Sequence, residues 1–353
     1  MSAIEEFAER GHERVGIFTD RATGIVAIIA VHDTTLGPGL GGCRMRPYPT
    51  LDDALHDALG LSEGMTYKNS LAGLNLGGGK AVLVADRTLT VGREDLFLSF
   101  GRCVESMGGA YITAEDMGTT VADMEVIRRV TAHVSGRDPQ CGGAGDPSPW
   151  TALGLFESMR VCLERVLGTT SFEGKRVVIQ GAGAVGRYLA AHLKRAGAVL
   201  SFSDAREKAL ADACREFEAD AVSIDEVYAT PCDIFSPCAI SNILTPDSIA
   251  RLQCRIVAGA ANTQLSTAED EVRLVNRGIL YAPDFVINSG GVILCAEERE
   301  PGGYTETRVR ERVGRIPETL RRVLEESARV GELPGRTAVR LAKERIAQAR
   351  RGS

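Results

Sequence analysis

Apolar residues in the first third of the chain fall into short runs, separated by one long stretch in which they return every three or four positions. Short apolar runs of this kind are typical of strands. Four of them occur, at residues 24–33, 43–48, 80–86 and 110–116. The pattern therefore predicts an α/β arrangement in which strands alternate with one long helix.

The long periodic stretch, residues 50–73, predicts a helix. Thr50 suits the N-cap and Asp53 the first turn, because a hydroxyl can accept from the free N–H groups there and an acid complements the helix dipole. Apolar residues return at Leu51, Leu55, Ala58, Leu61 and Met65. Lys68 lies three residues beyond the last of these, so the spacing predicts that it points along the buried face of the helix.

The second half of the chain opens with a segment rich in glycine, proline and aspartate, residues 136–150, which is typical of a crossing between domains. A helical pattern follows at 151–168. Residues 175–205 then read as strand, glycine turn, helix and second strand. Further apolar runs occur at 232–237, 255–261 and 278–287. The alternation predicts a parallel sheet, and helical patterning rich in arginine and glutamate fills about the last 45 residues.

A GxGxxG pattern stands between the predicted strand and helix and consists of Gly181, Gly183 and Gly186. In this context the amides at the helix N-terminus can bind a pyrophosphate, and Gly183 lets the backbone approach it. Asp204 ends the next strand, 23 residues after the first of these glycines. A carboxylate there binds the ribose diol and repels a 2′-phosphate, which favours NAD. Arg206 and Lys208 leave NADP open, and a strand–helix turn without ligand is the alternative.

A second GxGxxG spacing, formed by Gly37, Gly39 and Gly42, lacks this context. The residues after it, 43–50, show no helical periodicity. We therefore predict that this copy binds no nucleotide.

Composition limits the function classes that remain. The chain has 353 residues, 44% hydrophobic and 25% charged, which is ordinary for a soluble protein of two domains. A formal net charge of −6 without any basic tract argues against nucleic acid or an anionic membrane as partner. No apolar run approaches the roughly 20 residues of a membrane span, and the acidic N-terminus lacks the apolar core of a signal peptide.

The nine cysteines occur singly, without a CxxC pair. An odd number of scattered cysteines is typical of free thiols in a reducing cytoplasm. The five histidines form no cluster at metal-ligand spacing, so no metal site is predicted.

The segment LNLGGGKAVLVAD, residues 74–86, places three glycines directly before Lys80. It is not a phosphate-binding P-loop, because GxxxxGK[ST] would need glycine at Leu74 and a hydroxyl residue at Ala81. Glycine is costly to order. We therefore predict that the glycines let a small ligand lie against the backbone, while Lys80, at the mouth of the following strand, projects into the same cleft.

Lys68 and Lys80 differ from ordinary surface lysines because both are expected to be buried. A buried lysine must pair with an acid or give up its proton near neutral pH, and the second behaviour suits a general base. Asp116 is predicted where a strand ends, just before a helix. Helix capping is its alternative role, for which Thr119 and Thr120 are better placed. Two cations and one carboxylate facing a nicotinamide would suit oxidation of a zwitterion at the carbon that carries its amine.

Through these motifs the chain resembles the Glu/Leu/Phe/Val dehydrogenases over nearly its whole length. The stretches that carry the resemblance are LGPGLGGCRM, GMTYKNSLAGLNLGGGKAV, YITAEDMGTT, GDPSPWTALG, CDIFSPCA, VAGAANTQL and GILYAPDFVINSGG. The resemblance implies an α/β fold with a substrate-binding and oligomerisation domain at 1–135 and a Rossmann-type NAD-binding domain at 136–330. It further implies that C-terminal helices at 331–353 return to the first domain, that the active site lies in the cleft between the domains, and that the protein is a homo-oligomer.

The resemblance also implies roles for single residues. Lys80 would activate the water that attacks the iminium carbon, and Asp116 would shuttle protons to and from the departing amine. Lys68, helped by the backbone of Gly41 and Gly42, would bind the substrate carboxylate. The other residues implied near the substrate are Leu40, Met65, Ala114, Asn262, Asn288, Val292 and Cys295. Those implied near NAD are Thr151, Gly181, Gly183, Ala184, Val185, Gly186, Asp204, Cys238, Ala239, Ala260, Asn262 and Asn288.

Three departures from the family pattern lie near the expected cofactor face. They are Ile240-Ser241-Asn242, Thr263 and Ser289. They bear on affinity and substrate preference more than on the type of reaction.

The implied side-chain pocket is apolar or nearly so, and a second substrate carboxylate would be buried there without a partner. Leu40 would shorten this pocket, whereas the smaller Cys295 would enlarge it. The sequence therefore predicts NAD-dependent oxidative deamination of an apolar, branched-chain L-amino acid. The alternatives are a phenylalanine- or tryptophan-preferring enzyme of the same family, and a non-catalytic NAD-binding protein on the same fold.

Overall fold

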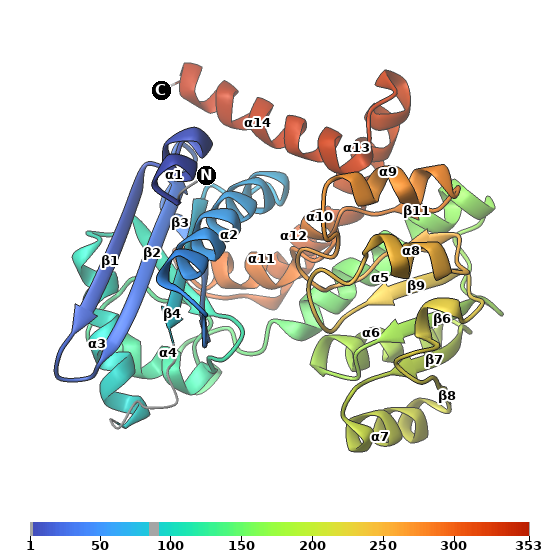
Figure 1. The fold of residues 1–353 in the computed structure, drawn as a ribbon, viewed down its shortest axis with the longest axis horizontal. Helices are drawn as coiled ribbons and strands as arrows, with labels where there is room; N and C mark the ends of the chain where they lie inside the picture. Colours follow the sequence, from blue (N-terminus) through green and yellow to red (C-terminus); the bar gives the residue numbers. More distant parts are fainter. Residues whose placement is uncertain (1–2, 85–91, 353) are drawn as a thin grey trace. The chain divides into compact units, whose positions relative to one another are not determined.

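A computed structural model describes residues 3–84 and 92–352, which form two compact units (Figure 1). Unit 1 comprises the chain up to Pro147 together with Val292–Val309 and the residues from Ala342 onward. Unit 2 comprises Ser148–Gly291 and Arg310–Leu341. The predicted domains, 1–135 and 136–330 with a returning segment 331–353, stay a prediction.

Unit 1 is built on a mixed sheet of five strands in the order β1-β2-β4-β3-β5. β1 and β4 run antiparallel to β2, and β3 runs parallel to both β4 and β5. The strands are β1 (Arg14–Asp20), β2 (Ile25–Asp33), β3 (Gly39–Arg46), β4 (Gly77–Val84) and β5 (Tyr111–Glu115). The helices of this part of the chain are α1 (Ala3–Arg10), α2 (Leu51–Leu71), α3 (Arg93–Ser106) and α4 (Val121–Arg128).

Helices cover both faces of this sheet. α2 packs on one face, where Ala54 and Ala58 meet Ile28 and Val82. α3 and α4 supply the apolar cluster on the other face, which includes Phe97, Phe100, Met124 and Ile127. The predicted α/β character is therefore confirmed, with a mixed sheet in this unit.

The strands in unit 1 differ from their predicted limits. β3 begins at Gly39 and ends at Arg46, so the strand predicted at 43–48 starts four residues too late. It begins inside the second GxGxxG spacing, which therefore leads into a strand, and the prediction that this copy lacks the nucleotide-binding context is confirmed. Ala85 and Asp86, the end of the strand predicted at 80–86, lie outside the described residues. β1, a half-exposed edge strand, is not among the predicted strands.

The glycine triplet lies within β4, which begins at Gly77, so the strand predicted at 80–86 starts three residues too late. A side chain on Gly78 would overlap Thr66 of α2, and one on Gly79 would come within 2.6 Å of the Tyr111 ring. One on Gly77 would overlap the carbonyl oxygen of Asp33. The space beside these glycines, which was predicted to hold a substrate, is therefore filled by the protein itself. Helix α2 and the neighbouring strands approach β4 too closely for any Cβ.

Helix α2 begins as predicted. The Thr50 hydroxyl accepts from the Asp53 amide, and the Asp53 carboxylate accepts from the Thr50 amide. Its buried face, however, is lined by small and polar residues: Ala54, Ala58, Ser62, Thr66, Asn69 and Ser70. Leu51 is 47% exposed. Lys68 is half-buried, like Met65 one turn before it, and is thus less buried than predicted. The glycines of β4 let small side chains approach more closely than the apolar pattern suggests.

Unit 2 is built on a parallel sheet of six strands in the order β11-β10-β9-β6-β7-β8, which confirms the predicted parallel sheet. The strands are β6 (Arg176–Gln180), β7 (Val199–Ser203), β8 (Asp220–Ala221), β9 (Ile234–Pro237), β10 (Ile256–Val257) and β11 (Leu280–Tyr281). The chain winds outward from β6 to β8 on one side and from β9 to β11 on the other. Such a reversal marks the ligand-binding edge of a doubly wound sheet.

The remaining helices lie mostly in unit 2. They are α5 (Ser148–Leu167), α6 (Ala184–Arg195), α7 (Glu207–Phe217), α8 (Pro246–Arg251), α9 (Glu269–Asn276), α10 (Asp284–Ile287), α11 (Gly290–Glu297), α12 (Glu306–Val313), α13 (Ile316–Val330) and α14 (Pro334–Gly352), with short 3₁₀ turns at Pro139–Cys141 and Val227–Ala229. No helix among the described residues is long and apolar enough to cross a membrane.

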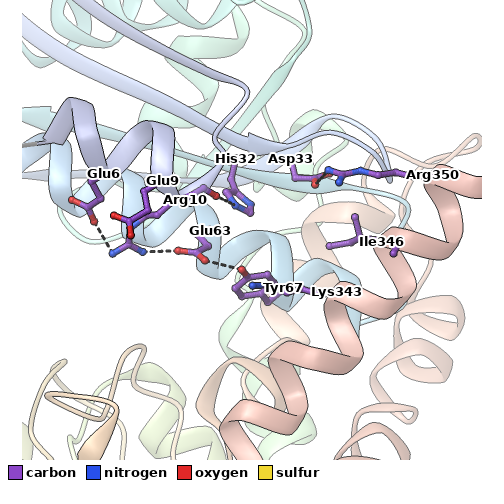
Figure 2. A pocket seen from close by; sticks show the side chains of 12 residues that line it. Glu6, Glu9, Arg10, His32, Asp33, Glu63, Tyr67, Lys343, Ile346 and Arg350 are labelled. Atoms are coloured by element: carbon purple, nitrogen blue, oxygen red, sulfur yellow. Dashed lines mark hydrogen bonds and ion pairs between the residues drawn. The ribbon is translucent and has the colours of Figure 1, made fainter.

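The C-terminal part of α14 belongs to unit 1 and is held to the rest of that unit by hydrogen bonds and an ion pair. Arg345 donates to the carbonyls of Ser70 and Leu74, at 2.9 and 2.8 Å, and Arg350 donates to Asp33 at 2.6 Å. A cavity of about 850 Å³ lies beside these contacts, between α1, β2, α2 and α14 (Figure 2). None of the predicted site residues lines it.

Candidate active site

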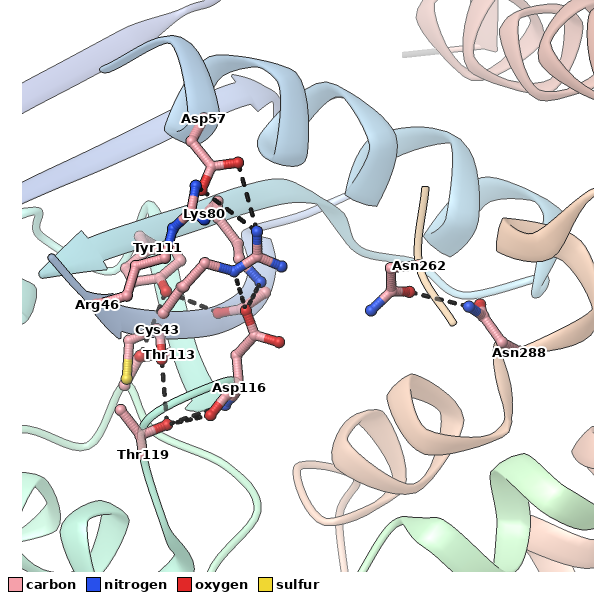
Figure 3. A network of polar contacts seen from close by, with 12 residues as sticks. Cys43, Arg46, Asp57, Lys80, Tyr111, Thr113, Asp116, Thr119, Asn262 and Asn288 are labelled. Atoms are coloured by element: carbon pink, nitrogen blue, oxygen red, sulfur yellow. Dashed lines mark hydrogen bonds and ion pairs between the residues drawn. The ribbon is translucent and has the colours of Figure 1, made fainter. Parts of the chain in front are cut away.

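Lys80 and Asp116 form a close, largely buried ion pair in unit 1 (Figure 3). The Lys80 Nζ donates to Asp116 Oδ2 at 2.6 Å, and the two side chains are 6% and 17% exposed. Lys80 lies in the middle of β4, opposite Ala30 of β2, and not at the mouth of the strand as predicted. Asp116 follows β5 directly, as predicted. The sheet places β3 between these two strands, so both side chains reach across it.

Capping does not explain Asp116. The N-cap of α4 is Thr120, whose hydroxyl accepts from the Asp123 amide. Asp116 instead directs its carboxylate to Lys80, while its backbone amide donates to the Thr119 hydroxyl at 2.9 Å. Of the two behaviours open to a buried lysine, the structure therefore shows pairing with an acid.

Arg44 is a third member of this group that sequence reasoning missed. Its Nε donates to Asp116 Oδ2 at 3.1 Å, and its Nη1 lies 3.3 Å from Asp57 Oδ2. Asp57, on α2, also accepts from the Tyr48 hydroxyl at 2.5 Å. Arg44 is only 8% exposed at its side chain, and an arginine between the apolar residues Cys43 and Met45 of a strand was the signal that could have identified it.

These two cations set the charge of Asp116. Burial by itself would raise the pKa of the Asp116 carboxyl, but Lys80 and Arg44 outweigh it and hold this pKa well below its usual range. The carboxylate is therefore ionised at neutral pH and bonded to a proton donor at 2.6 Å. Such a pair can pass a proton between the two residues and a third group that reaches them.

The predicted residues of β3 lie beside this pair. A Cβ on Gly42 would lie 2.7 Å from the Asp116 Cβ, so only glycine lets the carboxylate approach the strand. The Gly41 carbonyl accepts from the Tyr111 hydroxyl at 2.7 Å, and a Cβ on Gly41 would come within 3.2 Å of Met65. Met65 and Lys68 occupy the same half-buried stripe of α2. The structure thus brings Gly42 to Asp116 and Met65 to Gly41.

The residues predicted along the substrate side-chain pocket are apolar and mostly buried. Ala114 is 6% exposed, Cys295 is 9% exposed, and Val292 is half-buried. Burial raises the pKa of the Cys295 thiol to about 12, so this side chain is neutral. Leu40 is completely buried, and contact with a substrate would therefore require a neighbouring side chain to move.

The glycine turn of unit 2 connects β6 to α6. Gly181 has a φ of +116°, and a Cβ there would lie 2.9 Å from that of Ala239. A side chain on Gly186 would overlap the Gly181 carbonyl. Gly183, the N-cap of α6, has nothing within 4 Å of its added Cβ and makes no side-chain cap. Two of the glycines are thus required by packing, and the third leaves open space at the helix N-terminus that fits a pyrophosphate.

Asp204 lies beside this turn, directly after β7. It accepts from the Ala182 amide at 2.8 Å and from the Arg206 side chain through Nε and Nη2, both at 3.0 Å. The hydrogen bonds from Arg206 lower the pKa of Asp204 to about 2, against the opposing effect of burial. The carboxylate is therefore ionised, and the nearest guanidinium is directed at it.

The two predicted asparagines of unit 2 are hydrogen-bonded to each other (Figure 3). Asn288 Nδ2 donates to Asn262 Oδ1 at 2.9 Å and to the carbonyl of Ala260 at 3.1 Å. Nearby, a Cβ on Gly290 would lie 2.8 Å from the amide nitrogen of Thr151. The structure therefore brings these predicted residues together, whereas the Cys238–Ala239 backbone lies against Gly181.

Two of the family departures contact each other. The Asn242 amide donates to the Thr263 carbonyl at 2.7 Å, and both residues have left-handed backbones, with φ of 57° and 50°. Asparagine tolerates this conformation, whereas a β-branched threonine is strained in it. The third departure, Ser289, donates to the Val286 carbonyl at 2.8 Å within its own turn.

Residues 12–133 match the family model of the Glu/Leu/Phe/Val dehydrogenase dimerisation domain, and residues 142–212 and 205–352 match that of Glutamate/Leucine/Phenylalanine/Valine dehydrogenase. The chain belongs to the Glu/Leu/Phe/Val dehydrogenase family. It is an amino-acid dehydrogenase of that family, whose members use NAD or NADP.

Individual relatives match almost end to end. The chain is 44% identical to a leucine dehydrogenase of Bacillus subtilis, over 99% of this chain and 96% of the relative. It is 42% identical to a valine dehydrogenase of Streptomyces virginiae, over 96% and 95%. Among solved structures, an L-tryptophan dehydrogenase from Nostoc punctiforme is similar with a TM-score of 0.83 and 38% identity, over 99% of each chain. Within the described residues, no group of three or more His, Cys, Asp or Glu side chains could hold a metal ion.

Proposed function

We propose that the protein catalyses the reversible oxidative deamination of an apolar L-amino acid with NAD. The amino acid, NAD and water give the 2-oxo acid, ammonia, NADH and a proton. The observation that carries this proposal is the buried Lys80–Asp116 pair, with Nζ and Oδ2 2.6 Å apart. Two charged groups of opposite sign, kept from bulk water, are suited to proton transfer in each direction of the reaction.

Each residue of the chain would have one task in this reaction. Lys68 would bind the substrate carboxylate beside the backbone of Gly41 and Gly42. Lys80, once it has passed its own proton to Asp116, would take a proton from the attacking water, and Asp116 would exchange protons with the departing amine. The bound nicotinamide supplies the hydride acceptor, and Thr151, Asn262 and Asn288 would hold it and the substrate amine in place.

For the substrate we propose a branched-chain aliphatic amino acid. The leucine and valine dehydrogenases among the relatives support this class. The burial of Ala114 and the neutral Cys295 support an apolar pocket, because a second substrate carboxylate would be buried there without a partner. An aromatic substrate is the second candidate, since a tryptophan dehydrogenase is among the similar structures and Cys295 is small.

A panel of L-amino acids assayed by NADH absorbance tests the proposal. We expect the highest kcat/KM values with leucine, isoleucine and valine. These three values should differ from one another by no more than about a few tens of fold, because one methylene is worth about 1–3 kcal/mol in such a pocket. A tenfold preference for phenylalanine or tryptophan would overturn the branched-chain assignment but keep the chemistry. NAD binding without turnover on any amino acid would instead support a non-catalytic NAD-binding protein.

For the cofactor we expect NAD to exceed NADP in kcat/KM, because the ionised Asp204 would repel a 2′-phosphate. The pairing of Arg206 with Asp204 supports this expectation, since that guanidinium is already bonded. Asp204→Ala removes the carboxylate and frees Arg206. The ratio of kcat/KM with NAD to kcat/KM with NADP should therefore fall by at least tenfold. Steady-state assays with both cofactors measure it, with Asp247→Ala, which removes an exposed acid of α8, as the control. Equal use of NAD and NADP by the unmutated protein would contradict the role of Asp204.

We further propose a homo-oligomer in the cytoplasm. The match of residues 12–133 to a dimerisation domain supports the homo-oligomer. Nine cysteines without a disulfide support the cytoplasmic location. A monomer in light scattering at assay concentration, or secretion of the native protein, would contradict them.

A further inference from the structure

Glu298 holds the segment through which the chain first leaves unit 1. It follows the last residue of α11, and its side chain is only 3% exposed. Its Oε2 accepts from three backbone amides, those of Gly136, Arg137 and Ala144, at 3.0, 3.2 and 3.1 Å. Its Oε1 accepts from Arg137 Nε at 3.1 Å. One buried carboxylate thus receives four hydrogen bonds from a single loop.

These bonds hold together the two ends of the loop formed by residues 136–145, and the place where the ends meet is its neck. Gly136 and Arg137 lie at its beginning and Ala144 at its end, and the Gly145 amide donates to the Arg137 carbonyl at 3.1 Å. The loop is tight at this point, because a side chain on Gly143 would overlap the backbone of Arg137. Only two residues separate Gly145 from Ser148, where unit 2 and α5 begin. The direction in which the chain leaves unit 1 is therefore set close to Glu298.

Glu298 also lies near a second crossing of the chain between the units. Residues return to unit 1 at Val292, within α11, six residues before this glutamate. Further bonds join the same segments: Ser135 Oγ donates to the Cys295 carbonyl at 2.6 Å, and Arg299 donates to the Ala132 carbonyl at 3.1 Å. An acid at the end of a helix opposes the helix dipole. The position of Glu298 is therefore explained by the loop it binds and not by the helix that it follows.

The proposed reaction needs groups from both units. Lys80 and Asp116 belong to unit 1, whereas the glycine turn and Asp204 belong to unit 2. Hydride transfer requires the reacting atoms of substrate and nicotinamide to lie about 3–3.5 Å apart, and a misplacement of about 1 Å can cost roughly 100-fold in rate. The segments that join the units have to keep this geometry.

We propose that Glu298 is a positioning residue for the proposed reaction: by clamping the neck of the 136–145 loop, it fixes how the first crossing enters unit 2. This inference rests on the proposed function. The hydrogen bonds of the Glu298 side chain go to this loop. Its effect should therefore fall on kcat and not on the binding of either ligand.

Glu298→Gln tests this role. The substitution replaces one acceptor oxygen of the side chain by an NH₂ group, which cannot accept the N–H groups of the loop. Hydrogen exchange of the Gly136, Arg137 and Ala144 amides should become at least tenfold faster. We expect kcat with the preferred amino acid to fall about tenfold or more. KM for the amino acid and Kd for NADH, measured by fluorescence, should stay within twofold, which a general loss of structure would not produce.

The neighbouring Glu297→Gln is the matched control. Glu297 is the fully buried last residue of α11, and its carboxylate pairs with Arg308 at 2.7 Å. This variant should lose stability while the three amides and kcat stay within twofold of the unmutated protein. Should Glu298→Gln fail to fold, Arg137→Ala removes one of the four bonds and should raise exchange at Ala144 with a kcat loss of about threefold.

Unchanged exchange in Glu298→Gln, or a kcat within twofold of the unmutated protein, would overturn the proposal. The proposed function fails on a different result, the absence of turnover by the unmutated protein with any amino acid. In that case the catalytic consequence falls with it, and the exchange rates still decide whether Glu298 clamps the loop.

Discussion

Replacing Lys80 by alanine is expected to lower kcat by about 100- to 10,000-fold, the range that positioned acid–base groups contribute. The lysine would take the proton from the attacking water, and the described part of the chain places no second lysine on Asp116. Asp116 keeps Arg44 as a partner at 3.1 Å, so the negative charge of the carboxylate still has one cation beside it. Stopped-flow or steady-state NADH absorbance measures kcat, and NADH fluorescence should show a cofactor Kd within twofold of the unmutated value.

Lys343→Ala controls for the loss of a lysine from the same unit. Its Nζ lies over the Tyr67 ring at 5.5 Å, on α14, and it takes no part in the Asp116 group. We expect its kcat to stay within twofold. A Lys80→Ala protein that kept more than a tenth of the activity would show that another group is the base.

Asp116→Asn is the second substitution with a large expected effect. The amide keeps the shape of the side chain but cannot carry a proton to the departing amine, and it leaves Lys80 and Arg44 without their shared carboxylate. We expect kcat to fall by about 100-fold or more. Removing one partner of a buried ion pair costs about 3–5 kcal/mol, which urea denaturation at neutral pH would detect.

The stability difference should depend on pH in a defined direction. The folded pKa of Asp116 lies below the value of about 4 expected for the unfolded chain. Its contribution is therefore complete above pH 4 and is lost as the pH falls through the lower folded pKa. The unmutated protein and Asp116→Asn should thus converge in stability only in strong acid.

Asp57→Asn separates proton transfer from charge balance. Asp57 is the other acid on Arg44 but makes no contact with Lys80. We expect it to lose stability and to keep kcat within about fivefold. Equal losses of kcat in Asp57→Asn and Asp116→Asn would mean that Asp116 only balances Arg44 and does not move a proton.

The sequence by itself determined the features that depend on a few neighbouring residues. The capping pair Thr50 and Asp53 was read correctly, because a helix start requires side chains at fixed short spacing. The strand, glycine turn and helix around Gly181 were likewise predictable. So was the absence of that context after Gly42, since the periodicity of the following residues differs.

The sequence did not determine why three glycines precede Lys80. It correctly indicated that something approaches the backbone there, but the partners are Thr66 and Tyr111 of the protein itself. The apolar periodicity of α2 was misleading for the same reason. A helix that packs on glycine approaches through small and polar residues, which a hydrophobic pattern does not register.

Only the tertiary structure decided which charged groups meet. Lys80 and Asp116 are 36 residues apart, and β3 brings Arg44 between their strands. Glu298 binds amides more than 150 residues away in the chain. Apolar periodicity and the residue preferences of turns depend on residues close together in the sequence. Strand order and the closeness of packing depend on the whole core. The sequence therefore predicts the elements and the family of this protein, and the fold decides the partners of each buried charge.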